Sequence, residues 1–328
     1  MRRLTLILSD LYLPEEEAHD VVPMPNLEWL LRFANGRQSI TDWRTWLASE
    51  LGYVAGEIIP FASFSGPRDA WFATPVHLFA ALDHVRLDAR GLLTLASDER
   101  GAWCAAFART FGPQYVLHDD GVRGFFLTGL APANVRTADP ARLLGADIAA
   151  DIPRAAEAGE LRRLGAEIEM WLHAEPLNGA RTRRGERPVS ALWLWGGGVT
   201  PSRETAKPRQ SDVGFVGDDA FVAALARDAG QSMRAASLDG SEFGENASLP
   251  AHGVVVLAPM SGEPRQSLAD VDCLWLGAAR RSLERGALVE VVANDSVVRV
   301  SGRPSWRIWR RRSGWAKGLA RPPRDVKA

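Results

Sequence analysis

Apolar positions along this chain follow two alternating periods, one of about 3.6 residues and one of two, with short uniformly apolar runs between them. The 3.6-residue period predicts helices over 26–33, 42–51, 97–111, 154–173, 220–229 and 268–283. The remaining apolar segments predict strands at 4–9, 70–80, 85–87, 114–117, 121–127, 189–195, 213–216, 253–258, 288–292 and 296–300. Strands that alternate with helices predict an α/β fold. Turns at 118–121 and 294–295 predict hairpins, so we expect a mixed, largely parallel sheet with flanking helices.

The segment 131–153 interrupts this alternation, because it is rich in Pro, Ala and Asp and has no clear period. We interpret it as a connector and candidate hinge. The predicted division is an N-terminal α/β region over 1–130 and a C-terminal α/β region over 154–328. The second region contains the Trp-Leu-Trp-Gly-Gly-Gly strand and a basic tail.

The composition is 46% hydrophobic and 24% charged, as in globular domains, and no apolar run approaches the roughly 20 residues that span a membrane. The apolar start of the chain is short and leads into acidic residues, which is not the pattern of an export signal. We therefore expect a cytoplasmic protein without a membrane span. Two distant cysteines exclude a disulfide framework.

Charge is unevenly distributed along a chain whose net charge is −1. From Arg299 onward there are ten basic residues and one acidic residue, Asp325, so this region carries +9. Its segment 306–317 interleaves Trp with Arg, a pattern that can bind single-stranded nucleic acid or an anionic lipid surface. An edge strand with inward Trp side chains and Arg stems on the surface gives the same pattern.

The interval 178–198 is the strongest candidate for a binding site. An Arg-rich loop leads into the apolar strand 189–195, and three glycines follow the strand. Arginine presents a planar fork to phosphate or carboxylate, and glycine lets a ligand approach the backbone closely. We predict that an anionic small molecule binds along an edge formed by Asn178, Arg181, Arg184, Trp195, Gly196, Gly197 and Gly198.

A divalent metal site is the alternative hypothesis. Asp10 follows the first strand, and ligands bind beyond the carboxyl ends of strands in α/β sheets. His77, Asp83 and His84 supply imidazole and carboxylate groups that suit several metals. Turn caps and structural histidines account for the same residues. The sequence contains no Gly-x-Ser-x-Gly elbow, phosphate loop, dinucleotide fingerprint or HExxH motif.

Three sequence blocks resemble a known family. They are the block from Glu167 to Gly198, the segment 71–84 with its two histidines, and the closing Trp306-Arg307-Ile308-Trp309. Together they resemble the bacterial RpfE-type regulatory proteins, a phosphoglycerate-mutase-like family. The block 167–198 is also similar to archaeal-type cofactor-independent phosphoglycerate mutases. That second resemblance implies a partial alkaline-phosphatase-like fold and, in an active member, two divalent metals with a nucleophilic serine.

The sequence departs from the mutase pattern at several positions. Asp10 is followed by Leu11 and Tyr12 rather than by Gly and a second Asp, and Ser190 stands where Asn is usual. No serine lies in a strand-to-helix turn suited to a nucleophile. We therefore expect a regulatory or binding protein without catalytic residues, and a metal-dependent phosphotransferase or phosphatase as the alternative.

Overall fold

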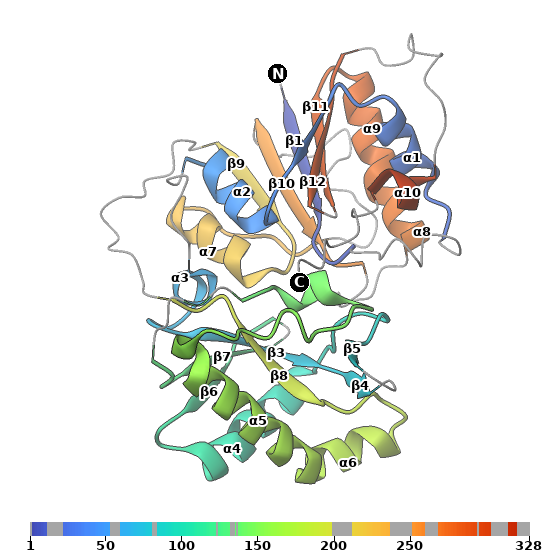
Figure 1. Cartoon of the computed structure of the whole chain (residues 1–328). Coiled ribbons are helices and arrows are strands. Elements are labelled where there is room, and N and C mark those ends of the chain that lie inside the picture. The colour runs from blue at the N-terminus through green and yellow to red at the C-terminus, as the bar shows by residue number, and fades with distance from the viewer. Residues whose placement is uncertain are drawn as a thin grey trace. The chain divides into compact units, whose positions relative to one another are not determined.

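The computed structural model describes residues 2–11, 22–52, 60–80, 84–122, 124–131, 135, 137–198, 212–236, 251–259, 268–293, 295–302 and 314–319. They form two compact units (Figure 1): unit 1 combines Met1–Ala55 with Thr205–Ala328, and unit 2 is the continuous segment Gly56–Glu204. This division does not coincide with the one based on sequence. The expected connector 131–153 lies within unit 2, where it buries Leu143, Leu144 and Ile148.

Unit 1 contains the largely parallel sheet that the sequence predicts. The six strands have the order β2-β12-β11-β1-β10-β9. Their bounds are β1 Arg3–Leu8, β2 Gly36–Ser39, β9 Val213–Val216, β10 His252–Leu257, β11 Leu288–Ala293 and β12 Ser296–Val300. The central strand β1 pairs in parallel with both β10 and β11, and β9 extends the parallel set. On the other side, β12 pairs antiparallel with β11, and the edge strand β2 pairs antiparallel with β12.

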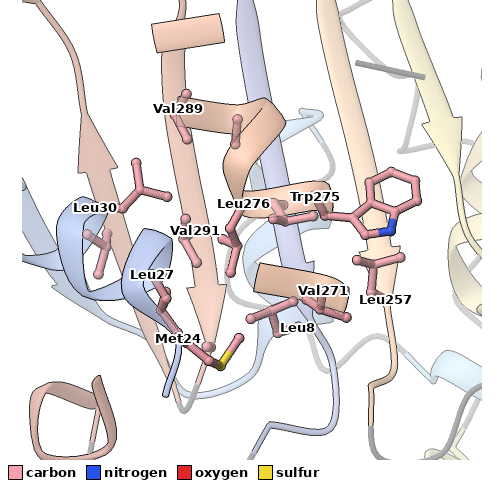
Figure 2. Packing of buried hydrophobic residues seen from close by; sticks show 14 of the residues in the cluster. Leu8, Met24, Leu27, Leu30, Leu257, Val271, Trp275, Leu276, Val289 and Val291 are labelled. Carbon is pink, nitrogen blue, oxygen red and sulfur yellow. The ribbon is translucent and has the colours of Figure 1, made fainter. Parts of the chain in front are cut away.

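Helices cover both faces of this sheet (Figure 1). One face carries α1 Pro25–Arg32, α8 Leu268–Asp270, a π-helical turn Val271–Leu276, α9 Gly277–Glu284 and α10 Trp315–Leu319. The other carries α2 Trp43–Glu50 and α7 Ala220–Asp228. Figure 2 shows Leu8 and Leu257 of the sheet facing Leu27, Val271 and Trp275 on the first face. Alternate residues of β1 enter this core because side chains of a strand alternate between its two faces.

The start of α1 differs by one residue from the predicted helix 26–33. Helix α1 begins one residue earlier, at Pro25, and Met24 in the cap position makes no capping hydrogen bond with its side chain. The cap comes from Asp272 in the π-helical turn, whose carboxylate accepts from the backbone N–H groups of Asn26 at 3.1 Å and Leu27 at 2.9 Å. The missing cap is therefore supplied from a residue about 245 positions away in sequence.

Unit 2 is built on an antiparallel sheet of four strands, β6-β7-β3-β8. The strands are β3 Trp71–Val76, β6 Val116–Asp119, β7 Phe125–Thr128 and β8 Ala191–Trp195, and a separate hairpin joins β4 Leu78–Ala80 to β5 Val85–Leu87. The helices are α3 Phe61–Ser65, α4 Ser97–Phe111, α5 Gly159–Ala174 and α6 Pro176–Arg183. Trp71 and Phe125 of the sheet pack with Trp103 and Phe107 of α4 and with Ile168 of α5 in one core.

The interval expected as an Arg-rich loop contains α6. Proline lacks a backbone N–H, so Pro176 cannot continue α5, but the same property suits it to the first turn of a new helix. No helix in the described part of the chain is long and apolar enough to cross a membrane.

Candidate functional site

Asn178 joins the end of α5 to the start of β8. Its side-chain amide donates to the carbonyl oxygens of Leu172 at 2.8 Å and Val189 at 2.9 Å. Its side-chain oxygen accepts from the backbone N–H of Val189 at 2.7 Å. These three bonds use most of the capacity of a nearly buried amide. The first predicted ligand-binding residue therefore holds the helix and strand together.

Two arginines lie near the end of α6 and differ strongly in exposure. Arg181 belongs to the last turn of the helix, and Arg184 is its C-cap. The Arg181 side chain is 5% exposed, and one of its terminal nitrogens lies 2.6 and 2.7 Å from the two carboxylate oxygens of Glu99. Arg184 is 50% exposed and donates through two nitrogens to Glu186 at 2.9 and 2.7 Å. Arg181 is thus committed to an internal ion pair, whereas Arg184 remains accessible.

Trp195 closes β8 on the sheet face away from α4 and α5. Its indole N–H donates to Thr74 Oγ1 at 2.9 Å, and its ring stacks on Phe72 with centroids 4.7 Å apart. Phe72 also stacks on Phe126 at 5.2 Å. The three rings are each about 95% buried, so Trp195 lies in a second small core and is not an exposed stacking platform.

The three glycines after β8 are required by packing. A Cβ on Gly197 would lie 2.1 Å from Cδ2 of Trp71. Because the backbone fixes the position of a Cβ, a change of rotamer at residue 197 could not relieve this overlap. Gly196 has φ +65° and its carbonyl accepts from Ala62 at the start of α3, at 2.9 Å. Gly198 has φ +151°, a conformation that L residues rarely adopt. The glycines let this turn lie against Trp71 and α3.

The structure therefore does not bring the two halves of the predicted edge together. Asn178 and Val189 mark the N-terminal end of β8, and Gly196 follows its C-terminal end. A strand of five residues spans about 16 Å. An anion bound by the arginines would not reach the glycines, so the accessible part of the predicted site is the end of α6.

The residues of the alternative metal hypothesis are divided between the two units. Asp10 belongs to unit 1, His77 and His84 belong to unit 2, and Asp83 lies outside the described residues. His77 Nδ1 is 3.0 Å from the carbonyl oxygen of Pro188, and His84 Nε2 accepts from Arg86 Nε at 2.7 Å. Among the residues that the structure describes, no group of three or more His, Cys, Asp or Glu side chains has metal-binding geometry.

The carboxyl edge of the unit 1 sheet is where α/β proteins generally bind ligands. Asp10 follows β1 there and is 1% exposed. Asp219 follows β9 and accepts from the backbone N–H groups of Phe221 and Val222, so it caps α7. This cap is a finding of the structure, and Asp219 also pairs with Arg44 of α2 at 2.8 Å. Asp219 is therefore committed to folding contacts.

A buried polar network lies at the opposite, N-terminal end of β1. Glu290 of β11 is fully buried and accepts from Arg3 at 2.8 and 3.0 Å, from Arg299 at 2.8 Å and from Thr5 at 2.8 Å. Burial alone would raise the pKa of Glu290, but hydrogen bonds from Arg3 and Arg299 outweigh it and hold the pKa below its usual value. Glu50 at the end of α2 pairs with the same two arginines.

His252 of β10 completes this network, with Nε2 at 3.0 Å from Thr5 Oγ1. The Thr5 hydroxyl gives its one proton to the Glu290 carboxylate, so His252 must donate through Nε2. Burial and the nearby Arg3 lower the pKa of His252 to about 4, which keeps the ring neutral near pH 7. Sequence reasoning missed this network, although Glu290 is a polar residue inside the apolar run 288–293.

The basic C-terminal region is described only in part. Trp315 of α10 is 1% exposed, packs in the unit 1 core and donates from Nε1 to the Val22 carbonyl oxygen at 2.9 Å. It is therefore not an exposed stacking residue. Trp306, Trp309 and the Arg310–Arg312 run lie outside the described residues.

Comparison with known proteins gives a distant relationship. A segment of 86 residues, 26% of the chain, is 34% identical to 2,3-bisphosphoglycerate-independent phosphoglycerate mutase 2 of Methanothermobacter thermautotrophicus. The chain spans only 21% of the length of that enzyme. No protein-family model matches the sequence. The chain is thus distantly phosphoglycerate-mutase-like in sequence.

Two solved structures align with most of the chain. The cofactor-independent phosphoglycerate mutase of Thermoplasma acidophilum aligns over 92% of this chain and 89% of its own, with 17% identity and a TM-score of 0.40. The PH0037 protein of Pyrococcus horikoshii aligns over 92% and 88%, with 15% identity and a TM-score of 0.44.

Proposed function

We propose that this chain is a cytoplasmic binding protein of the RpfE-type regulatory kind, a relative of the phosphoglycerate mutases that performs no catalysis. Its ligand is an anionic small molecule held at the end of α6. The observation that carries the proposal is the guanidinium of Arg184, which is half exposed while that of Arg181 is buried. Arg183 beside it is also exposed.

An anion would compete with two carboxylates for Arg184, because Glu186 pairs with it at 2.7 Å and Glu99 lies 3.5 Å away. The Arg184–Glu186 pair is exposed on both sides, and exposed ion pairs are weak, so an anion can displace Glu186. A phosphate or carboxylate offers two oxygens to the same planar fork. Arg181, held by Glu99, would keep α6 in place during the exchange.

The commitment of several carboxylates supports a role without catalysis. Asp219 caps α7 and pairs with Arg44, and Asp88 is held by Arg90 and Arg187 at 2.7 and 3.0 Å. Although burial opposes it, hydrogen bonding by Arg90 and Arg187 lowers the pKa of Asp88 to about 2. Carboxylates that accept from guanidinium groups are poorly placed to ligate a metal or move a proton.

The test of binding is calorimetric titration with phosphoglycerate, the metabolite named by the relative. We expect Arg184→Gln to weaken binding by about tenfold or more, the loss of one charge-assisted contact. Arg163→Gln is the matched control. Arg163 lies on the neighbouring helix α5, is 54% exposed and pairs with Glu167 of the same helix. Equal affinities of the Arg184 variant and the unaltered protein for phosphoglycerate would show that the ligand does not bind at the end of α6.

Catalysis is tested separately, by a mutase assay with Mn²⁺ added. We expect no turnover above a buffer control. Measurable conversion between phosphoglycerate isomers would refute the proposal that the chain performs no catalysis, and would leave the Arg184 titration to be judged on its own.

A metal-dependent phosphotransferase or phosphatase is the second candidate, because Asp10 is a buried carboxylate at the carboxyl end of the central strand. A divalent metal there would activate water or polarise a phosphoryl oxygen. The test is metal content by mass spectrometry of protein purified without chelator. Stoichiometric metal that disappears in Asp10→Asn would support this candidate, and metal-free protein with no thermal shift in Mn²⁺, Zn²⁺ or Mg²⁺ would end it.

A further inference from the structure

Cations and aromatic rings alternate along the outer side of α1 in unit 1. The guanidinium of Arg280, from α9, lies 4.4 Å from the centroid of the Trp29 ring. The Trp29 and Phe33 rings are 4.9 Å apart, and Arg32 lies 5.0 Å from the Phe33 ring. Trp29 is partly exposed and packs against the unit 1 core, and Arg280 also pairs with Glu284 at 3.6 Å.

Further arginines surround this stack. Arg281 and Arg285 are exposed at the end of α9, and Arg2 lies at the same corner because its carbonyl accepts from Leu288 at 2.9 Å. The structure describes Arg2, all of α1 and the segment 277–285. Together these contain five arginines and two glutamates, Glu28 and Glu284. We call the surface of Arg2, Trp29, Arg32, Arg280, Arg281 and Arg285 the α1–α9 face.

Helix α10 lies beside α1 on this same side of unit 1. Helix α10 packs against α1, and the backbone N–H of Trp315 donates to Glu28 Oε1 at 3.3 Å. Glu28, an acid of α1, is therefore already engaged.

We propose that the α1–α9 face binds the phosphate backbone of single-stranded nucleic acid. Guanidinium groups neutralise phosphates, and a partly exposed aromatic side chain beside them can contact the bases of a single strand. A membrane-surface helix would instead present large exposed apolar side chains. Among the described residues, none of the large exposed apolar side chains lies on α1 or α9.

The test measures anisotropy of a fluorescent 20-residue oligouridine with the full chain at 50 and 200 mM NaCl. The triple variant Arg280→Gln, Arg281→Gln, Arg285→Gln should bind at least about tenfold more weakly at 50 mM. Its plot of log affinity against log salt should be shallower by about 0.7 for each phosphate contact removed. Arg109→Gln, Arg154→Gln, Arg163→Gln is the matched control, because these three exposed arginines lie in unit 2.

Circular dichroism melting of both triple variants shows whether either has lost its fold. Three results would overturn the proposal: no binding of oligouridine by the unaltered chain at 50 mM NaCl, an equal loss in the control variant, or an unchanged salt dependence in the α1–α9 variant. Binding to phosphatidylserine vesicles in the absence of oligouridine binding would also reject it, and would assign the face to a lipid surface.

Discussion

At the scale of single residues, the glycines after β8 show how one sequence feature can serve two purposes. Three consecutive glycines suggest a close ligand approach, because they lack a side chain. Here the same lack lets Gly197 lie against the indole of Trp71, and Trp71 is fully buried in the unit 2 core. The space that glycine opens is filled by the protein itself.

The first prediction concerns that contact. We expect Gly197→Ala to destabilise the protein by about 1–3 kcal/mol or more, because the added methyl would overlap the Trp71 ring. Gly165→Ala is the control: Gly165 lies inside α5, where an added Cβ would have nothing within 4 Å, so alanine should stabilise by about 0.5–1 kcal/mol. Urea unfolding curves measure both. Equal midpoints for the two variants would show that the turn can move away from Trp71.

The second prediction concerns pH and His252. Its pKa is about 4 in the folded protein and roughly 6.5 when unfolded. Between these values the unfolded chain binds a proton that the folded chain excludes, so stability should fall as pH drops from about 6.5 to 4. His252→Gln, which keeps a donor for Thr5, should flatten this decline in urea midpoints measured at pH 7, 6 and 5. The exposed His173→Gln should not, and a decline that is identical in all three proteins would contradict the prediction.

At the scale of elements, the contacts that position a helix come from distant parts of the chain. Helix α1 is capped by Asp272, and α2 is held at its two ends by Asp219 through Arg44 and by the arginines that share Glu50. Asp272, which caps α1, lies in the π-helical turn Val271–Leu276. A π-helical turn is wound more widely than an α-helix, so its side chains point in different directions from those of a regular helix.

The third prediction tests the cap. Asp272→Ala leaves two backbone N–H groups at the start of α1 without their acceptor, so we expect a loss of about 1–2 kcal/mol. Asp272→Asn keeps one acceptor oxygen and should lose less. Hydrogen exchange of the first turn of α1 provides a local readout. Unchanged exchange there in Asp272→Ala would mean that packing alone fixes the start of the helix.

Local patterns predicted most elements, but not the contacts between them. The helix from 97 to 111 and the hairpin between β11 and β12 are as expected, because each depends on neighbouring residues. The Asp272 cap was missed because Leu27 lies 245 positions away, and the Glu290 network was missed because Arg3 and Thr5 lie more than 280 positions from Glu290. The burial of Arg181 could not be predicted for a similar reason, because Glu99, the carboxylate that pairs with it, lies 82 positions away.

At the scale of the whole molecule, the chain builds two hydrophobic cores by different routes. The core of unit 2 uses one continuous segment, Gly56–Glu204. The core of unit 1 needs both ends of the chain, since β1 pairs with β10 and β11. The sequence-based boundary at 131–153 followed a change in composition, which does not report which strands pair.

The fourth prediction follows from this arrangement. Residues 56–204, produced alone, should fold cooperatively, because their sheet, helices and buried aromatic core are complete within the segment. Near-ultraviolet circular dichroism and a single urea transition would verify it. A chain lacking residues 56–204, with the two remaining segments joined by a Gly/Ser linker, should retain the unit 1 core. Failure of residues 56–204 to show a cooperative transition would mean that they depend on unit 1.

The position of β1 also has a consequence during protein synthesis. The strand ends at Leu8, whereas its partners β10 and β11 begin at His252 and Leu288, so β1 is synthesised well before either partner. At about 5–20 residues per second, β1 waits some 15–60 seconds with its apolar side chains unpaired while unit 2 emerges and folds. The nascent chain is therefore a client for ribosome-associated chaperones over that interval, and premature termination before His252 yields a product with a folded middle and an exposed, aggregation-prone beginning.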